Sequence, residues 1–390
     1  MASVEILFVA AGASLFMAWA IGAGSSGSTP FAPAVGANAI SIMRAGFVVG
    51  ILGFAGAVLQ GANVSEAVGG ELIQGVALSP AAAVIGLTTA AILVAIGVFA
   101  GYPIATAFTV TGAVVGVGLA MGGDPAWAKY RQIGALWVAT PFIGGGIAYG
   151  TAKTLRDERV PERIAVPLLA GVVGVILANV EFTFLGPSGE QASLVAALSA
   201  GSDLAPLLVR GGVSAVAAAL AVLALWWDVR GDEARGQRHF LLVLGGLVAF
   251  SAGGSQVGLA TGPLLPLVGP IGIPIMPVLV GGGIGLLIGS WTGAPRMIKA
   301  LSQDYSSLGP RRSIAALIPS FAIAQTAVFF GIPVSFNEII VSAIVGSGYA
   351  AGNSAVSRNK MAKTVLAWVG SLALALGIGY GAFSVVDALL

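Results

Sequence analysis

Long apolar stretches divide this sequence almost from end to end, and their length restricts the fold more than any other feature. They lie at about residues 4–22, 40–60, 79–101, 103–121, 132–150, 164–186, 206–227, 240–258, 271–291, 311–330, 333–352 and 364–385. A helix needs about 20 apolar residues to cross the hydrocarbon core of a bilayer. Charged residues make up only 9% of the 390 residues, far below the roughly 25% of a soluble domain. The sequence therefore predicts an all-α, polytopic membrane protein with about 12 transmembrane helices, covered mostly by lipid.

Most basic residues gather in four short loops. These loops run from Lys153 to Arg163, from Asp228 to His239, from Arg296 to Arg312 and from Arg358 to Lys363. Two predicted spans separate each loop from the next, so all four lie on one side of the membrane. Short loops rich in Lys and Arg stay in the cytoplasm, which accounts for the basic residues without a nucleic-acid partner. We therefore expect a multi-pass protein of the cell membrane with both termini extracellular.

The sequence lacks the residues that several kinds of chemistry require. There is no cysteine, which excludes disulfides, iron–sulfur clusters and thiolate nucleophiles. The sequence also has no P-loop, no nucleophile and base at a specific spacing, and no cluster of metal ligands. We therefore expect neither an enzyme, nor an ATP-driven pump, nor a protein with a bound cofactor.

An internal repeat relates the two ends of the chain at an offset of 230 or 231 residues. Matching segments include Gly101-Tyr-Pro-Ile with Gly331-Ile-Pro-Val, Ala135-Leu-Trp-Val with Leu366-Ala-Trp-Val, and Gly146-Ile-Ala-Tyr-Gly with Gly377-Ile-Gly-Tyr-Gly. Each repeat holds five spans and two spans separate them, so the halves have opposite orientations. Inverted repeats of this kind are typical of secondary transporters. We divide the chain into a first repeat (1–155), a central linker with two spans (156–238) and a second repeat (239–390).

Glycine, proline and serine interrupt the first apolar stretch of each half. The two interruptions are Gly22–Pro33 and Gly253–Pro263. Carriers with inverted repeats bind their substrates near the midplane at broken helices in corresponding positions. A helix N-terminus there offers free N–H groups to an anion, although a kinked helix without a ligand would have the same sequence. We expect an oxyanion to be bound by hydroxyl groups of this region: Ser25, Ser26, Ser28 and Ser255.

A second pair of helix starts follows the Gly-x-Pro turns, at Pro103 and Pro333. Proline suits the first turn of a helix, and Thr106 and Ser335 would add hydroxyls to the oxyanion site. Glu338 stands in an apolar stretch, where a carboxylate is costly and points to function. It could bind a cation, carry a proton, accept a hydrogen bond from a protonated oxyanion, or be paired for structure alone. Its counterpart in the first half is an aromatic residue, Phe108. The residues expected to serve a coupling ion, sodium or a proton, are Gln256, Asn337 and Glu338.

These segments resemble the inorganic phosphate transporter (PiT) family over nearly the whole chain. Members carry a Pro-Val-Ser-Thr-Thr-His element late in each half, followed by a helix of small residues. The start of that element survives in Pro333-Val-Ser335, and its helix in Ala343-Ile-Val-Gly346 and Ala113-Val-Val-Gly116. An early element, Gly-Ala-Asn-Asp-Val-Ala-Asn-Ala, has Ser25 and Gln256 in place of its aspartates. The resemblance implies an ion-coupled anion carrier, with phosphate as substrate and a homodimeric assembly.

The predicted function is therefore secondary active transport of inorganic phosphate by alternating access, driven by a cation gradient. A permease for sulfate or another inorganic anion is the near alternative. Phosphate keeps a proton near neutral pH and benefits from an acceptor such as Glu338, whereas sulfate has no proton to donate. An uncoupled channel or a membrane sensor is the third interpretation, because the aspartates of the resembling family are missing.

Overall fold

Helices form most of the computed structural model, which describes residues 4–183, 185–186, 191–200, 205–352 and 356–389. The α-helices are α1 (Val4–Ile21), α2 (Ala32–Gly36), α3 (Ile42–Gln60), α4 (Ala62–Gly70), α5 (Pro80–Ala100), α6 (Thr106–Ala120), α7 (Trp127–Arg156), α8 (Glu162–Asn179), α9 (Leu194–Ala200), α10 (Pro206–Gly231), α11 (Glu233–Thr261), α12 (Leu265–Val268), α13 (Ile275–Thr292), α14 (Ala294–Gln303), α15 (Pro310–Phe329), α16 (Phe336–Tyr349) and α17 (Arg358–Leu389). A π-helical turn, η1 (Gly22–Ser26), follows α1, and 3-10 turns η2 (Gly262–Leu264) and η3 (Gly269–Ile271) flank α12.

Within the described residues, four short strands connect helices. Strand β1 (Ile73–Gln74) pairs antiparallel with β2 (Asp124–Pro125), and β3 (Glu181–Phe182) pairs with β4 (Ala192–Ser193). The first pair joins the segment before α5 to the segment after α6. It therefore closes the base of the α5–α6 hairpin.

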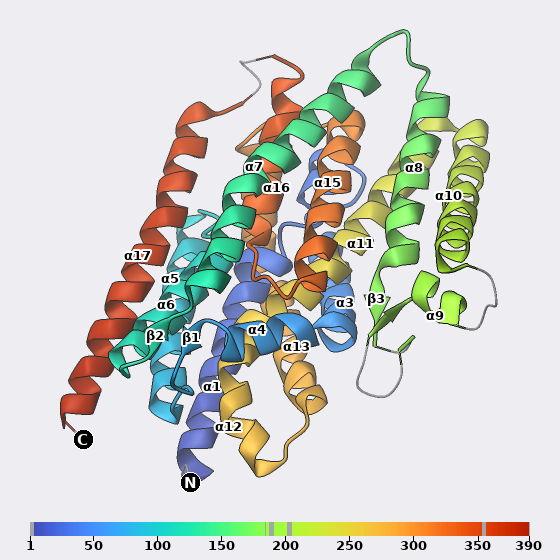
Figure 1. Ribbon diagram of the computed structural model, residues 1–390. Helices are drawn as coiled ribbons and strands as arrows, with labels where there is room; N and C mark the ends of the chain where they lie inside the picture. Colours follow the sequence, from blue (N-terminus) through green and yellow to red (C-terminus); the bar gives the residue numbers. More distant parts are fainter. Residues whose placement is uncertain (1–3, 184, 187–190, 201–204, 353–355, 390) are drawn as a thin grey trace.

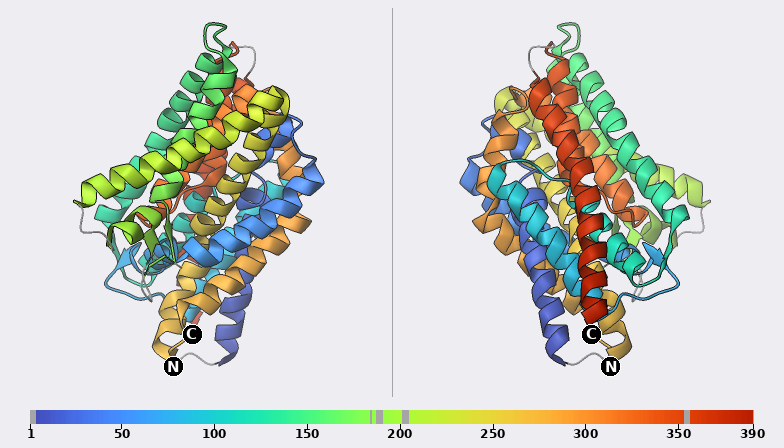
Figure 2. Two further views of the ribbon diagram at one scale, coloured as in Figure 1. Left: turned by 90° about the vertical axis from the view of Figure 1, so that its right-hand side faces the viewer. Right: turned by 90° about the vertical axis from the view of Figure 1, so that its left-hand side faces the viewer.

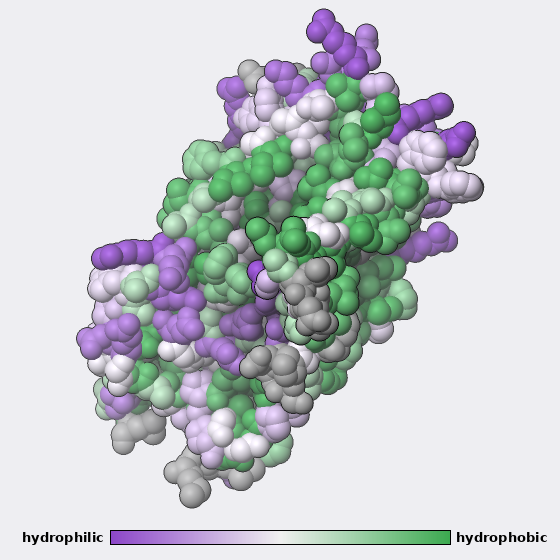
Figure 3. Space-filling view, turned by 45° about the vertical axis from the view of Figure 1, so that its right-hand side comes forward, coloured by the Kyte–Doolittle hydropathy of each residue, from purple (hydrophilic) through white to green (hydrophobic). Residues whose placement is uncertain are grey.

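Ten helices of the described chain are long and apolar enough to cross a membrane, and the predicted all-α polytopic membrane fold is confirmed. Their outer faces carry exposed apolar side chains such as Phe8, Phe142, Leu207 and Trp227. Figure 3 shows hydrophobic residues over the middle of the molecule and hydrophilic residues gathered towards its ends. Helix α10 contributes no buried residue in its most apolar window. The apolar surface that these helices expose is one that lipid would cover.

Two of the twelve predicted spans, 103–121 and 333–352, form only half-length helices. Helix α6 has 15 residues and α16 has 14, which gives lengths of about 21–23 Å at 1.5 Å per residue. The hydrocarbon core is about 30 Å thick. Both helices are short because the prolines at 103 and 333 stand in non-helical segments, so that helix begins only at Thr106 and Phe336. The two half-helices are buried along nearly their whole length.

The predicted interruption at Gly22–Pro33 is present, whereas the one predicted at Gly253–Pro263 is wrong over most of its length. Helix α11 continues to Thr261 and yields to a 3-10 turn only at Gly262. Gly253 does not break the helix, because its task is packing: a Cβ there would lie 1.8 Å from the carbonyl oxygen of Gly53 on α3. Glycine thus brings α11 and α3 into backbone contact, which small residues permit in membranes.

Each half-helix packs against the last long helix of the other half of the chain. Helix α6 lies along α17, and α16 lies along α7. Glycines bring both pairs together: a Cβ on Gly116 would lie 2.3 Å from the carbonyl oxygen of Leu376, and one on Gly346 would lie 2.1 Å from that of Gly145. The two buried half-helices are therefore held by the opposite ends of the sequence.

Both chain termini lie at one end of the molecule (Figures 1 and 2). The connections α7–α8, α10–α11 and α16–α17 lie at the opposite end, the upper one in Figure 1. Three of the four basic loops belong to these connections. The structure thus separates the termini from these basic loops, as the loop count predicts.

Candidate functional site

The predicted site residues belong to four segments that meet inside the protein. These segments are η1, the start of α6, the middle of α11 and the start of α16, and they contact one another. All nine predicted side chains are buried, with at most 2% of their surface exposed: Ser25, Ser26, Ser28, Thr106, Ser255, Gln256, Ser335, Asn337 and Glu338. The site is therefore closed to solvent from both ends in this conformation.

A side-chain amide links the first three segments. Gln256 on α11 accepts hydrogen bonds on its Oε1 from the hydroxyl of Thr106 at 2.7 Å and from that of Ser25 at 3.2 Å. Its Nε2 donates to the carbonyl oxygen of Val334 at 2.5 Å. One neutral amide thus joins residues from both ends of the chain, and a buried polar network that is satisfied in this way fixes the local geometry.

Asn337 makes a second set of links from the first turn of α16. Its Nδ2 donates to the carbonyl oxygen of Gly24 at 2.9 Å and to that of Ile104 at 2.6 Å. Both carbonyls belong to the places where the chain leaves regular helix, just before Ser25 and Thr106. Asn337 therefore holds the two interruptions of the first half against the start of α16.

Several polar atoms of this centre have no hydrogen-bond partner within the described part of the chain. They are the hydroxyls of Ser255 and Ser335, the Oδ1 of Asn337 and the Oε2 of Glu338. A buried polar atom without a partner costs roughly 1–3 kcal/mol, so such atoms need an explanation. Two of the four can donate a hydrogen bond and two offer only acceptor oxygens while the carboxyl is ionised. Together they suit a ligand that carries both acceptor oxygens and a proton or positive charge.

The serines of the first interruption differ in what they offer. The Ser28 hydroxyl donates to the carbonyl oxygen of Ser25 at 3.2 Å, and Thr29 donates to the same oxygen at 3.0 Å. These bonds close the turn after η1, so in this conformation the Ser28 proton is not free for an anion. Ser26 is buried in the same turn, and its role stays a prediction.

Two further hydroxyls were missed by reasoning from the sequence. Thr111 on α6 and Ser342 on α16 are buried, and within the described residues their side-chain oxygens have no hydrogen-bond partner. They lie one turn and more beyond the starts of the two half-helices. A hydroxyl residue in the second turn of each half-helix is a signal that the sequence already contained.

Two tryptophans support the non-helical segments before the half-helices. Trp137 on α7 donates its Nε1 proton to the carbonyl oxygen of Pro333 at 2.9 Å, and Trp368 on α17 donates to that of Pro103 at 2.8 Å. Trp137 also stacks on Phe108 with ring centroids 3.8 Å apart. The apolar counterpart of Glu338 is thus engaged with an aromatic ring, and the site differs between its two halves.

Two lysines contact the turns that precede the half-helices. Lys129 pairs with Glu71 at 2.6 Å and donates to the carbonyl oxygen of Gly331 at 3.2 Å. Lys360 pairs with Asp304 at 3.3 Å, and its Nζ lies 4.4 Å from the ring centroid of Tyr102. The first lysine begins α7 and the second begins α17. Those two helix starts lie at opposite ends of the molecule (Figure 1).

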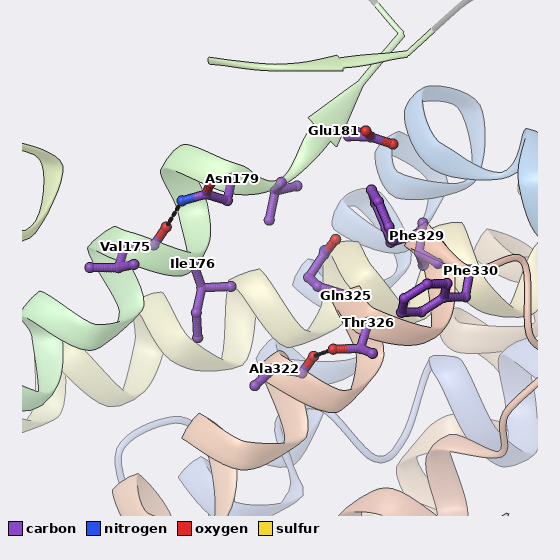
Figure 4. A pocket seen from close by; sticks show the side chains of 11 residues that line it. Val175, Ile176, Asn179, Glu181, Ala322, Gln325, Thr326, Phe329 and Phe330 are labelled. Carbon is purple, nitrogen blue, oxygen red and sulfur yellow. Dashed lines mark hydrogen bonds between the residues drawn. The ribbon is translucent and has the colours of Figure 1, made fainter. Parts of the chain in front are cut away.

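A cavity of about 410 Å³ lies apart from this centre, and none of the nine predicted residues lines it. Figure 4 shows side chains from the end of α8 facing those from the end of α15, with Asn179 and Thr326 bonded back to their own helices. Gln325, which also lines it, donates to Ser251 at 2.6 Å. The cavity is mainly apolar, and Glu181 is its one carboxylate.

Fold and buried centre define a multi-pass α-helical membrane protein whose polar residues converge inside the bundle. Residues 9–379 match the model of the phosphate transporter family. The chain therefore belongs to the phosphate transporter family, which confirms the resemblance seen in the sequence.

Individual relatives agree with this assignment. A protein of Thermococcus kodakarensis that is provisionally named a phosphate permease is 26% identical over 381 residues, covering 90% of each chain. The chloroplastic inorganic phosphate transporter 2-1 of Arabidopsis thaliana is 24% identical, over 91% of this chain and 68% of its own length. A solved structure of a sodium-dependent phosphate transporter has the same fold, with a TM-score of 0.82 and 21% identity over 99% of this chain and 100% of its own.

Proposed function

We propose that this protein is a permease that carries inorganic phosphate across the cell membrane, and that the buried centre is its substrate site. The observation that carries the proposal is the set of partnerless buried atoms on Ser255, Ser335, Asn337 and Glu338. A hydrogen phosphate ion has oxygens for the two serine hydroxyls and a P–OH proton for an acceptor. The family to which the chain belongs supports the same substrate.

Phosphate fits this donor and acceptor set better than sulfate does. Both ions are tetrahedral oxyanions, but sulfate has no proton to give near neutral pH. The free oxygens of Asn337 and Glu338 would then face sulfate oxygens with no hydrogen between them, and an ionised carboxylate would repel the ion. Sulfate is therefore the weaker candidate, and the hydroxyls alone would have to hold it.

Glu338 is our candidate for the residue that couples transport to a cation gradient. The positions where the resembling family has aspartates hold Ser25 and Gln256, and these are hydrogen-bonded to each other. Two neutral side chains that satisfy one another offer no charge to a cation. Glu338 is buried and carries a free carboxylate oxygen, so a proton or a sodium ion would bind there. Its occupation offsets the charge of the phosphate inside the membrane.

The proposed mechanism is alternating access of two inverted repeats, 1–155 and 239–390, around this centre. The crossed contacts of α6 with α17 and of α16 with α7 support it, because a tilt of one half moves both half-helices together. We place the basic end in the cytoplasm by the positive-inside rule, which puts both termini outside. The lysines at 129 and 360 would then close the extracellular and cytoplasmic sides in turn.

Uptake of radiolabelled phosphate into proteoliposomes tests this proposal. Purified protein is reconstituted and uptake is started under an inward proton gradient, an inward sodium gradient, or neither. We expect concentrative uptake under one gradient only, strong inhibition by Ser335→Ala, and loss of gradient dependence in Glu338→Gln. Excess unlabelled sulfate should compete weakly.

Matched controls separate the site from general damage. Ser320→Ala removes a buried hydroxyl of α15 that bonds only within its own helix, and Glu66→Gln neutralises an exposed carboxylate. Both should transport like the parent protein. Unchanged uptake in Ser335→Ala and Glu338→Gln together would refute the site assignment, and uptake that never exceeds equilibrium would favour a channel.

A further inference from the structure

A second cavity, of about 580 Å³, lies where four helix ends meet at the basic end of the molecule. The end of α7 and the starts of α8, α11 and α15 surround it. Its lining is Arg156, Glu162, Glu233, Ala234, Gln237, Gly309, Pro310, Arg311 and Arg312. None of the proposed transport residues is among them. The cavity joins the first half, the central spans and the second half of the chain.

The carboxylates of this cavity are already engaged. Glu162 pairs with Arg311 and also accepts a hydrogen bond from Gln237 at 2.6 Å. Glu233 pairs with Arg163 at 3.2 Å, whose guanidinium lies outside the lining. Neither acidic group is therefore left to neutralise further positive charge in the cavity.

Two arginines remain without an acidic partner. Among the described residues, Arg156 forms no ion pair, and Arg312 donates only to the hydroxyl of Ser307 at 3.1 Å. Both arginines line the same cavity, so two positive charges share one space. Like charges held side by side without a counter-charge are unfavourable, and a bound anion relieves that repulsion. Guanidinium groups present paired N–H donors that match the oxygens of a phosphate group.

We propose that this cavity is a binding site for a phosphate group, separate from the transport centre, with Arg156 and Arg312 as its ligands. The volume exceeds that of one inorganic phosphate ion, so the site also has room for a phosphate that carries a substituent. Two sources supply this chemistry: free phosphate in solution and the headgroup of an acidic phospholipid at the membrane surface. A phosphate group bound in this cavity would hold the first half, the central spans and the second half of the chain together.

Arginine-specific labelling tests the site without interference from the transport centre, which contains no arginine. The wild-type protein is placed in nanodiscs of phosphatidylcholine, treated with phenylglyoxal, digested and analysed by peptide mass mapping. Inorganic phosphate is added to one sample, and phosphatidylglycerol replaces part of the lipid in another. Arg159, in the same loop as Arg156 and outside the cavity lining, is the internal reference.

We expect the modification rates of Arg156 and Arg312 to fall relative to Arg159. At a ligand concentration ten times the dissociation constant the fall should be about tenfold. Protection by inorganic phosphate identifies a soluble anion, and protection only with phosphatidylglycerol identifies a lipid headgroup. In an Arg156→Gln variant the remaining arginine should lose most of its protection, whereas Arg358→Gln, at an exposed position outside the lining, should leave protection intact. Equal rates for all three arginines under every condition would overturn the proposal.

Discussion

Trp137 and Trp368 make the same contact in opposite halves of the molecule. Each tryptophan belongs to a long helix, and its indole N–H donates to the carbonyl oxygen of the proline before the half-helix of the other half. The donor–acceptor distances are 2.9 Å for Trp137 and 2.8 Å for Trp368. A proline nitrogen cannot hydrogen-bond, so each segment depends on its carbonyl for an anchor. These two bonds position Thr106 and Ser335.

Replacing either tryptophan with phenylalanine keeps the ring and removes the donor. We expect each variant to lose about 1 kcal/mol of stability, since a buried carbonyl is left without its partner, and to transport phosphate more slowly. Differential scanning fluorimetry and proteoliposome uptake measure the two effects. Trp227→Phe, at an exposed position of α10, is the control. Wild-type stability and uptake in both Trp137→Phe and Trp368→Phe would show that the two indole hydrogen bonds are dispensable.

The two lysine pairs should have opposite effects on access to the site. Lys129→Met removes the ion pair with Glu71 at one end of the molecule. Lys360→Met removes the ion pair with Asp304 at the other end. If each pair contributes about 1.4 kcal/mol, the open population on its side rises about tenfold. Because the protein has no cysteine, a single Ser335→Cys can be labelled with an impermeant maleimide from either side of sealed vesicles.

Labelling should rise from one side in the first variant and from the other side in the second. Lys153→Met, at an exposed position in the last turn of α7, should change neither rate. An increase from the same side in both variants contradicts the assignment of the lysines to opposite ends.

The contact between Gly253 and Gly53 should tolerate no side chain. A methyl group at 253 would meet the carbonyl oxygen of Gly53 at 1.8 Å, so α11 and α3 would have to separate. Overpacking of this kind costs about 1–3 kcal/mol or more, and Gly253→Ala should melt at a lower temperature. Gly370→Ala on α17 meets nothing within 4 Å and should stabilise its helix by about 0.5–1 kcal/mol. Equal melting temperatures would mean that the helices do not touch here.

Glu181 predicts a pH effect on stability. Partial burial raises the pKa of this carboxyl above its ordinary value of 4.5, so the folded protein holds the proton more tightly than the unfolded chain does. Stability from this group is present at low pH and is lost as pH rises from 4.5 through the raised pKa. In Glu181→Gln this contribution should vanish. Melting curves at several weakly acidic pH values, compared between the variant and wild type, measure the change in slope; parallel slopes would refute it.

Much of the site could be predicted because its residues recur at a fixed spacing. The repeat offset pairs Ser25 with Gln256 in the sequence. In the structure the Ser25 hydroxyl lies 3.2 Å from the Oε1 of Gln256. The start of each half-helix was visible in a proline followed by Thr106 or Ser335. Apolar length alone predicted the membrane fold.

Other features depend on contacts that no single sequence displays. Gly253 has the composition of a helix break, but its neighbour Gly53 shows that it serves close packing. The hydroxyl of Ser28 is used inside its own turn, which depends on backbone geometry. Arg156 and Arg312 lie far apart in the sequence, and only the fold places them at one cavity.

The unlike pair of Phe108 and Glu338 has a consequence for the direction of transport. If the two halves were identical, exchanging their conformations would give two end states of equal free energy. Here one half presents a ring stacked on Trp137 and the other a carboxylate with a free oxygen. In the alternating-access mechanism proposed above, the two end states of the empty protein would therefore differ in free energy, and one of them would be populated more than the other.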